Sequence, residues 1–336
     1  MGAGWTGVDL FFVLSGFLIT RILLAARESP RYFQNFYARR VLRIFPLYYG
    51  VLFVALVLGP LLTGRWPQGP SQLWLWLYGS SVYPAWTNQW NEFPNALGLR
   101  LRHFWSLSIE EHFYLVWPFL VWWLSRRTLR RVCVFLFMAS LALRIAMRAA
   151  GFDYGPIYSF TPARLDGLSV GAFLAILTME GSVSAARLAG IARVVLVVLV
   201  VCGSGAAVCS AVGGTSNFTN WPMLTLGISF FALFYGALLV LVLQAPASSR
   251  LGRVFGGRVL GFFGAYSYGI YVFSGLLIDK FDSGPLSMDG MTFGPSAYLP
   301  RLFLHTILCS AISVAIAFVS YNLFEKPFLK LKRFFA

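Results

Sequence analysis

The feature that most constrains this chain is a series of long apolar segments separated by short clusters of arginine and lysine. Nine segments are long enough to span a bilayer as helices, since the hydrocarbon core needs about 20 apolar residues. They cover residues 8–26, 44–63, 106–124, 132–149, 165–181, 190–212, 221–243, 259–279 and 302–323. Backbone groups inside a bilayer must pair within the chain, which favours helices. The pattern predicts an all-α, polytopic membrane bundle.

The composition supports a membrane protein. Hydrophobic residues make up 58% of the 336 positions and charged residues only 12%, whereas soluble domains carry about 25% charged residues. The net charge of +15 does not indicate nucleic-acid binding, because the basic residues lie in short clusters between apolar segments. We expect no nucleic-acid partner, and we interpret the four cysteines as small core residues.

The basic clusters predict the orientation of the chain. Cytoplasmic loops of membrane proteins are enriched in Lys and Arg. The candidate inner loops are 27–43, which contains Arg40 and Arg43, 125–131, 182–193 and 244–258, and the C-terminal tail lies on the same side. All five basic segments lie on the same side of the membrane only if a further apolar stretch, 72–87, does not cross the bilayer. Its Trp and Tyr residues suit an interfacial or re-entrant segment at the outer face. We expect a multi-pass protein of the bacterial cytoplasmic membrane, surrounded by membrane lipid.

One predicted span starts with a concentration of ionisable side chains. The run from His103 to Tyr114 contains two histidines and two glutamates, and ionisable groups beside a membrane span indicate a functional site. If residues 103–124 form one helix, several of these side chains share a face at i, i+3 or i+4 spacing. The residues on that face are His103, Ser106, Glu110, Tyr114 and Trp117. A capped and solvated helix end is the structural alternative.

Four blocks of the sequence, taken together, resemble the integral-membrane acyltransferase 3 family. The first is GVDLFFVLSGFLI at residues 7–19, and the second is FYARRVLRIFP at residues 36–46. The third is HFWSLSIEEHFY at residues 103–114, followed by Pro118, and the fourth is RLDGLSVG at residues 164–171. Each block is moderately specific, and the four in order cover nearly the whole chain.

The resemblance implies one membrane acyltransferase domain over residues 1–336, with no fused soluble domain. It implies transfer of an acyl group, with acetyl as the first expectation, from cytoplasmic acyl-CoA to a hydroxyl of a glycan, glycolipid or glycosylated natural product. Acyl-CoA is then a co-substrate, and no cofactor or metal is expected. The family's first helix, with a histidine held essential for transfer, has no counterpart in this chain. We therefore expect the chain to be N-terminally incomplete.

The resemblance also assigns roles to particular side chains. Acyl transfer to a hydroxyl needs a base and donors that stabilise the developing oxyanion. Glu110 and His103 are the candidate catalytic residues, and His103 is the nearest substitute for the family's first-helix histidine. Arg40 and Arg43 are candidate binders of the donor's phosphates, which suit guanidinium forks. The other candidate substrate-binding residues are Asp9, Trp105, Ser106, Tyr114, Arg164 and Asp166.

Several features have structural interpretations. Arg164 and Asp166 stand at i, i+2, so each is expected to partner another helix, as an ion pair or as a substrate contact. Arg144 lies inside an apolar span and needs a partner, for which Asp166 and Asp153 are the candidates. Residues 167–171 match G-x-S-x-G, but a nucleophile elbow requires a strand–turn–helix. In a membrane helix the two glycines favour close helix packing instead.

Two alternative functions remain open at this stage. A transporter or flippase of a polar or lipid-linked solute would line a through-path with its polar residues, and no product ester would form. Charges gathered at both ends of the predicted spans, rather than at one midplane site, favour the enzyme slightly. The second alternative is an inactive, truncated remnant that scaffolds a complex.

Overall fold

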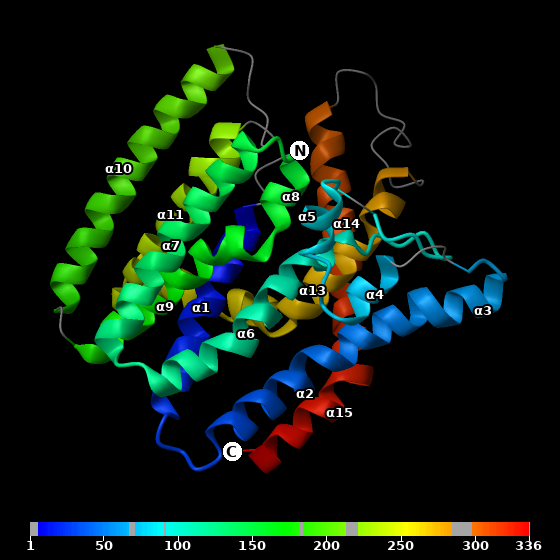
Figure 1. The fold of residues 1–336 in the computed structure, drawn as a ribbon, viewed down its shortest axis with the longest axis horizontal. Helices are drawn as coiled ribbons and strands as arrows, with labels where there is room; N and C mark the ends of the chain where they lie inside the picture. Colours follow the sequence, from blue (N-terminus) through cyan, green and yellow to red (C-terminus); the bar gives the residue numbers. More distant parts are fainter. Residues whose placement is uncertain are drawn as a thin grey trace. The chain divides into compact units, whose positions relative to one another are not determined.

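The computed structural model describes residues 6–66, 71–90, 92–181, 184–212, 221–283 and 298–335, which form helices and turns with no β-strand in these ranges (Figure 1). Seven helical segments here are long and apolar enough to cross a membrane. They are Gly7–Ala25, Tyr32–Thr63, Arg126–Ala149, Thr161–Glu180, Met223–Gln244, Arg258–Ser283 and Pro300–Phe335. This confirms the predicted all-α, polytopic membrane architecture.

Two of the nine predicted spans correspond to helices outside this set. Helix α6 (Trp105–Trp123) covers the predicted span 106–124, and its first half carries the polar run. Helix α10 (Ala185–Val212) covers 190–212, and part of its side chains lie outside the described residues. With 19 and 28 residues, both helices have spanning length. Nine spans therefore remain the prediction for the chain.

The apolar stretch 72–87 does not form a spanning helix. It contains two short helices, α4 (Ser71–Trp76) and α5 (Tyr83–Thr87), of 6 and 5 residues. At a rise of about 1.5 Å per residue, neither approaches the roughly 30 Å of a hydrocarbon core. This agrees with the prediction that 72–87 does not cross, while the sidedness of the chain stays a prediction.

The chain divides into two compact units, each assembled from separated stretches. The first consists of Met1–Tyr32, Ser80–Trp90 and Trp105–Gly256, and the second of Phe33–Gly79, Asn91–Phe104 and Gly257–Ala336. The remaining helices of the first unit are α1 (Gly7–Ala25), α7 (Arg126–Ala149), α8 (Tyr154–Ser159), η4 (Thr161–Arg164), α9 (Leu165–Glu180), η5 (Met223–Gly227), α11 (Ile228–Gln244) and α12 (Arg250–Phe255). The single-domain interpretation of residues 1–336 stays a prediction.

The centre of the first unit is a backbone-to-backbone contact between α1 and α9 (Figure 1). A Cβ atom on Gly16 would lie 2.0 Å from the carbonyl oxygen of Leu168, and one on Gly171 would lie 2.0 Å from that of Val13. Only glycine fits at such an approach. The G-x-S-x-G match is therefore a helix-packing surface, as predicted, because its second glycine faces another helix backbone.

In the second unit, α2 (Tyr32–Phe53) begins earlier than the predicted span 44–63. The inner loop expected over 27–43 is thus largely helical, which corrects the placement of Arg40 and Arg43 in a loop. The physical reason is that buried side chains recur at helical spacing on both sides of these arginines, at Phe36, Ile44 and Leu47.

Two long C-terminal helices pack in the second unit as well. They are α13 (Arg258–Ser283) and α14 (Tyr298–Ser320). The Tyr268 hydroxyl on α13 donates to the backbone carbonyl of Ile44 on α2 at 2.8 Å. The remaining elements of this unit are η2 (Val54–Leu58), α3 (Gly59–Thr63), η3 (Arg102–Phe104), η6 (Tyr321–Glu325), α15 (Lys326–Lys330) and η7 (Leu331–Phe335).

Candidate functional site

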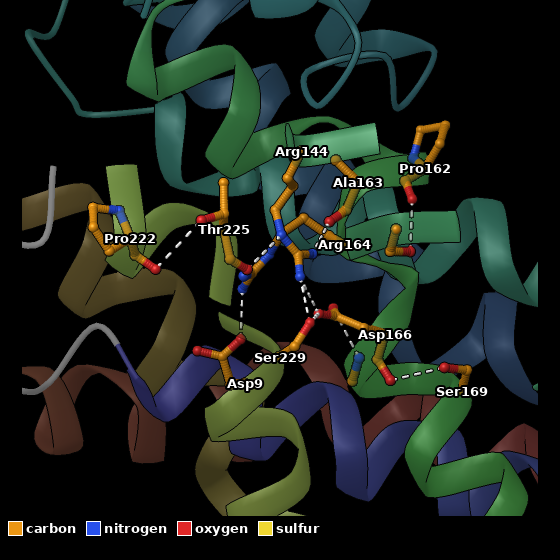
Figure 2. A network of polar contacts seen from close by, with 12 residues as sticks. Asp9, Arg144, Pro162, Ala163, Arg164, Asp166, Ser169, Pro222, Thr225 and Ser229 are labelled. Atoms are coloured by element: carbon orange, nitrogen blue, oxygen red, sulfur yellow. Dashed lines mark hydrogen bonds and ion pairs between the residues drawn. The ribbon is translucent and has the colours of Figure 1, made fainter. Parts of the chain in front are cut away.

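Four charged side chains form two ion pairs in the interior of the first unit (Figure 2). The Arg164 Nη2 atom lies 2.7 Å from Asp9 Oδ1, and Arg144 Nη2 lies 2.8 Å from Asp166 Oδ2. All four residues are at most 1% exposed. Arg164 and Asp166 do partner other helices, as predicted, and of the two candidates for Arg144 the structure selects Asp166 over Asp153.

Neutral groups complete the coordination of Arg144 and Asp166 (Figure 2). The Arg144 guanidinium donates to the backbone carbonyls of Ala163 and Thr225 and to the Ser229 hydroxyl. The Ser229 hydroxyl in turn donates to Asp166 Oδ2 at 2.9 Å. No sequence pattern pointed to Ser229 or Thr225, because each is one ordinary polar residue in an apolar segment. Together these contacts join α7, η4, α9, η5 and α11.

The Arg164 guanidinium is enclosed by aromatic rings. It lies 4.9 Å from the ring centroid of Tyr158, 5.5 Å from that of Phe12 and 5.6 Å from that of Trp105. Such contacts stabilise a desolvated cation through the ring quadrupole. The network has two positive and two negative charges, so its formal charges balance, while Asp9 Oδ2 and two nitrogens of Arg164 make no hydrogen bond in the described residues. Trp105 thus reaches this network, while a substrate contact of Asp9, Arg164 or Asp166 stays a prediction.

The polar face predicted for the 106–124 segment is present on α6. Ser106, Glu110, Tyr114 and Trp117 are buried, with Glu110 2% exposed. The Tyr114 hydroxyl is hydrogen-bonded to the Ser15 hydroxyl of α1, and the Trp117 ring Nε1 donates to Thr20 Oγ1 at 2.8 Å. The face therefore packs into the bundle interior rather than ending in solvent. A carboxylate at such a position is costly, and it indicates function more strongly than an exposed one.

His103 does not lie on this helix. The predicted helix from residue 103 begins instead at Trp105, and His103 lies in the preceding 3₁₀ turn η3. Contacts within the second unit explain the difference: the His103 ring Nδ1 pairs with the Arg100 carbonyl oxygen at 2.9 Å, and Tyr271 of α13 donates to the His103 carbonyl. His103 and Glu110 belong to different units, and their cooperation stays a prediction.

The environment of the His103 ring fixes its charge state. The ring lies directly against α13, because a Cβ atom on Gly275 would be 2.4 Å from His103 Cδ2. Burial lowers the pKa of His103 to about 4. The ring is therefore neutral near pH 7, which is the state a general base needs, although a pKa this low makes it a weak base.

The candidate donor-binding arginines lie on α2 among further cations. Arg43 and its neighbour Arg39 are exposed, and Arg40 is half-buried. The C-terminal turn η7 adds Lys332, which feels the charges of all three arginines. Arg39 Nε donates to the carbonyl of Phe335 at 2.6 Å, which anchors η7 to α2. Sequence reasoning left out Arg39, although it is adjacent to Arg40, and it missed Lys332 because that residue lies at the opposite end of the chain.

No metal centre is evident in the described ranges, since they contain no group of three or more His, Cys, Asp or Glu residues able to hold an ion. The carboxylates of the buried network are neutralised by arginines instead. The second histidine of the polar run, His112, pairs through Nδ1 with the Thr161 hydroxyl at 2.9 Å. These groups are therefore accounted for by contacts within the protein.

Within the described ranges, seven helical segments long and apolar enough to span, buried ion pairs and a buried carboxylate on a polar helix face define a multi-pass membrane protein with a polar interior. The model of the acyltransferase domain family matches residues 3–322. The chain belongs to that family.

Three relatives show how far the likeness extends. Peptidoglycan O-acetyltransferase OatA of Listeria monocytogenes is 30% identical over 283 residues, which is 80% of this chain and 44% of the relative. YrhL of Bacillus subtilis, named as a candidate peptidoglycan O-acetyltransferase, is 30% identical over 348 residues, or 96% of this chain and 50% of the relative. A candidate O-acetyltransferase of Staphylococcus aureus is 25% identical over 355 residues, or 97% of this chain and 53% of the relative.

The chain thus spans about half the length of the curated relatives it matches. No solved structure matches the chain.

Proposed function

We propose that this chain transfers an acetyl group from acyl-CoA to a hydroxyl of a cell-surface glycan. The observation that carries the proposal is the buried Glu110 carboxylate, 2% exposed, on the polar face of α6 in a member of the acyltransferase domain family. A membrane protein keeps an ionisable group in its interior at a cost of a few kcal/mol, so the group is retained for chemistry or for a structural pair.

The proposed reaction is a single transfer. The acceptor hydroxyl oxygen attacks the carbonyl carbon of the thioester, a C–O bond forms and the C–S bond breaks. A base takes the proton of the hydroxyl, and the departing thiolate takes up a proton to give free CoA. Glu110 is assigned the proton transfer or the orientation of the base. Neutral His103 is a candidate for the base that takes this proton.

The donor is assigned to the cluster formed by Arg39, Arg40, Arg43 and Lys332. The charges of the three arginines repel that of Lys332, and an anion placed among these side chains would relieve that repulsion. Guanidinium groups bind phosphates through paired N–H donors. Coenzyme A carries such phosphates on the cytoplasmic side, where the charge pattern predicts this cluster to lie.

The names of the relatives support an acceptor class for the proposal. Two of them carry peptidoglycan O-acetyltransferase in their names, so peptidoglycan is the first acceptor to test. The protein would then work in the bacterial cytoplasmic membrane, with its acceptor on the outer face.

The test compares Glu110→Gln with Glu111→Gln in the full natural protein, expressed in a strain lacking it. Glu111 is a matched control, since it is the adjacent carboxylate and is half-buried. Base-labile acetate on purified peptidoglycan and on other surface glycans is measured by mass spectrometry. We expect Glu110→Gln to lower acetylation by at least 100-fold, with Glu111→Gln close to the parent.

Full acetylation by the Glu110→Gln variant would remove Glu110 from the chemistry. If the parent protein forms no ester on any glycan but moves a labelled solute across vesicles, the chain is a transporter and the proposed function is wrong.

A further inference from the structure

We propose that a polar pocket in the first unit binds one sugar ring of the acceptor glycan. The pocket has a volume of about 320 Å³ and lies where α7, α8 and the start of η5 meet. Its lining residues are Arg148, Phe152, Asp153, Tyr154, Ile157, Trp221 and Leu224. The inference rests on the proposed function and gives the acceptor a place. The charge pattern predicts that these helix ends face outward, toward the glycan layer.

A tight turn between α7 and α8 builds one wall of the pocket. Helix α7 ends at Ala149, and Gly151 takes the left-handed conformation with φ +82°. The Gly151 N–H donates to the Arg148 carbonyl at 3.1 Å, and the Phe152 N–H donates to the Met147 carbonyl at 3.0 Å. This pair of bonds closes the helix end in the Schellman pattern. The turn therefore holds Arg148 next to the residues that open α8.

Asp153 occupies a capping position without capping. It precedes the first residue of α8, where an Asp side chain usually accepts a backbone N–H, but this carboxylate makes no cap hydrogen bond. Its backbone N–H instead donates to Asn88 Oδ1 at 3.0 Å, which ties the turn to α5. Within the described residues, no side-chain hydrogen bond or ion pair involves the exposed Asp153 or Arg148. Five N–H donors and two acceptor oxygens are thus available to a ligand.

Two exposed aromatic rings form another wall of the pocket. Tyr154 is 39% and Trp221 58% exposed. The Trp90 ring packs beside Tyr154, with 6.2 Å between the ring centroids. Gly155 leaves room for it, because a Cβ atom at that position would lie 2.5 Å from the Trp90 ring. A sugar ring presents an apolar C–H face and an edge of hydroxyls, so it matches aromatic walls beside an arginine and a carboxylate. A lipid chain would leave these two charges unsolvated.

The pocket is joined to the buried ion-pair network. Thr225 Oγ1 donates to the carbonyl of Trp221 at 2.7 Å, and the Thr225 carbonyl accepts from Arg144 Nε at 3.2 Å. Figure 2 shows Thr225 between Arg144 and the neighbouring Pro222. One turn after Tyr154, the Tyr158 ring lies 4.9 Å from Trp105, the first residue of α6. A ring held in the pocket is therefore fixed relative to the helix that carries Glu110.

The experiment measures binding apart from catalysis. The probe is an unacetylated tetrasaccharide of alternating N-acetylglucosamine and N-acetylmuramic acid, added to the full natural protein in detergent without a donor. Affinity is measured by saturation-transfer NMR titration for the parent, Trp221→Ala and Asp153→Asn. Trp123→Ala is the matched control, because Trp123 is 68% exposed at the far end of α6. Folding of every variant is checked by gel filtration and thermal unfolding.

We expect Trp221→Ala and Asp153→Asn each to weaken binding about tenfold, while Trp123→Ala binds like the parent. In the transfer assay, Trp221→Ala should raise the acceptor KM and leave kcat unchanged. The inference is wrong if the parent does not bind the probe, if neither pocket variant weakens binding, or if Trp123→Ala weakens it equally. The last result would make Trp221 an ordinary interfacial anchor.

The two proposals fail separately. If the parent protein forms an ester on glycan while the pocket variants bind and react normally, the sugar-binding pocket is wrong and the transferase function stands. If the parent protein binds the probe through Trp221 but forms no ester on any glycan, the sugar-binding pocket stands and the transferase function is wrong.

Discussion

Arginine is used in two opposite ways in the two units. In the first unit, Arg144 and Arg164 are fully buried, and each has a carboxylate within 2.8 Å. In the second unit, Arg39, Arg40 and Arg43 all act on the like charge of Lys332, and Arg43 also interacts with the carboxylate of Glu325. A buried arginine paired with a carboxylate stabilises the fold, although Arg164 keeps two guanidinium nitrogens, Nε and Nη1, without a hydrogen-bond partner in the described residues. A group of like-charged side chains near solvent loses stability through repulsion and gains it when an anion binds.

The largest effect is expected from breaking a buried pair. Asp9→Ala leaves the Arg164 guanidinium buried without its carboxylate, which costs about 3–5 kcal/mol. We expect the variant to accumulate poorly in membranes and to unfold at a markedly lower temperature. Arg43→Ala, treated in the same way, should keep the parental Tm. Equal losses for the two variants would show that the contrast between the units is wrong.

A conservative exchange tests whether fork geometry matters in the network. Arg144→Lys keeps the charge but loses the planar set of donors that reaches Asp166, Thr225 and Ala163. Leaving one buried carbonyl without a donor costs about 1–3 kcal/mol, so we expect a smaller loss of Tm than in Asp9→Ala. The measurement is thermal unfolding in detergent. A Lys variant as stable as the parent would mean that the positive charge at residue 144 is sufficient and that the fork geometry of arginine is not needed.

Substitutions in the cluster of Arg39, Arg40, Arg43 and Lys332 should lower the affinity for the donor rather than the stability of the protein. If Arg43 binds a phosphate of the donor as proposed, Arg43→Ala removes one charge-assisted contact worth about 1.5–3 kcal/mol, and we expect the KM for acyl-CoA to rise at least tenfold. The kcat at saturating donor should change little. The check is steady-state transfer at several salt concentrations, since the contact weakens as ionic strength rises. An unchanged KM would remove Arg43 from the donor site.

The smallest effect is expected at Lys332. Lys332→Ala removes one of the repelling charges, so the protein without donor should be slightly more stable, while donor binding weakens a few-fold. Opposite signs in the two measurements are the diagnostic result. Thermal unfolding with and without coenzyme A provides both values, and a loss of stability in both conditions would place Lys332 in a structural role.

Local patterns predicted most of the architecture. Apolar length marked the spanning helices, and period marked the buried face of α6, because both signals lie within about 20 residues of sequence. The glycines of α9 were also readable, since close packing is the usual reason for small residues four positions apart in a membrane helix. These features depend on neighbours along one helix.

Features that depend on distant contacts were not readable. Asp9 and Arg164 are 155 positions apart, and no local pattern joins them. His103 leaves the helix because its ring is held against α13. In each case tertiary packing overrides a locally reasonable interpretation.

The glycine contact between α1 and α9 has a consequence for how the first unit can move. The two helices run in the same direction, since Asp9 meets Arg164 near their starts and Val13 meets Gly171 further along. Sliding one helix past the other by a single residue would drive a Cβ atom into a carbonyl and also part the ion pair. The contact between α1 and α9 is therefore fixed both by close backbone packing and by an ion pair. The two helices must move as one rigid body, so a conformational change in the first unit has to involve the helices around them.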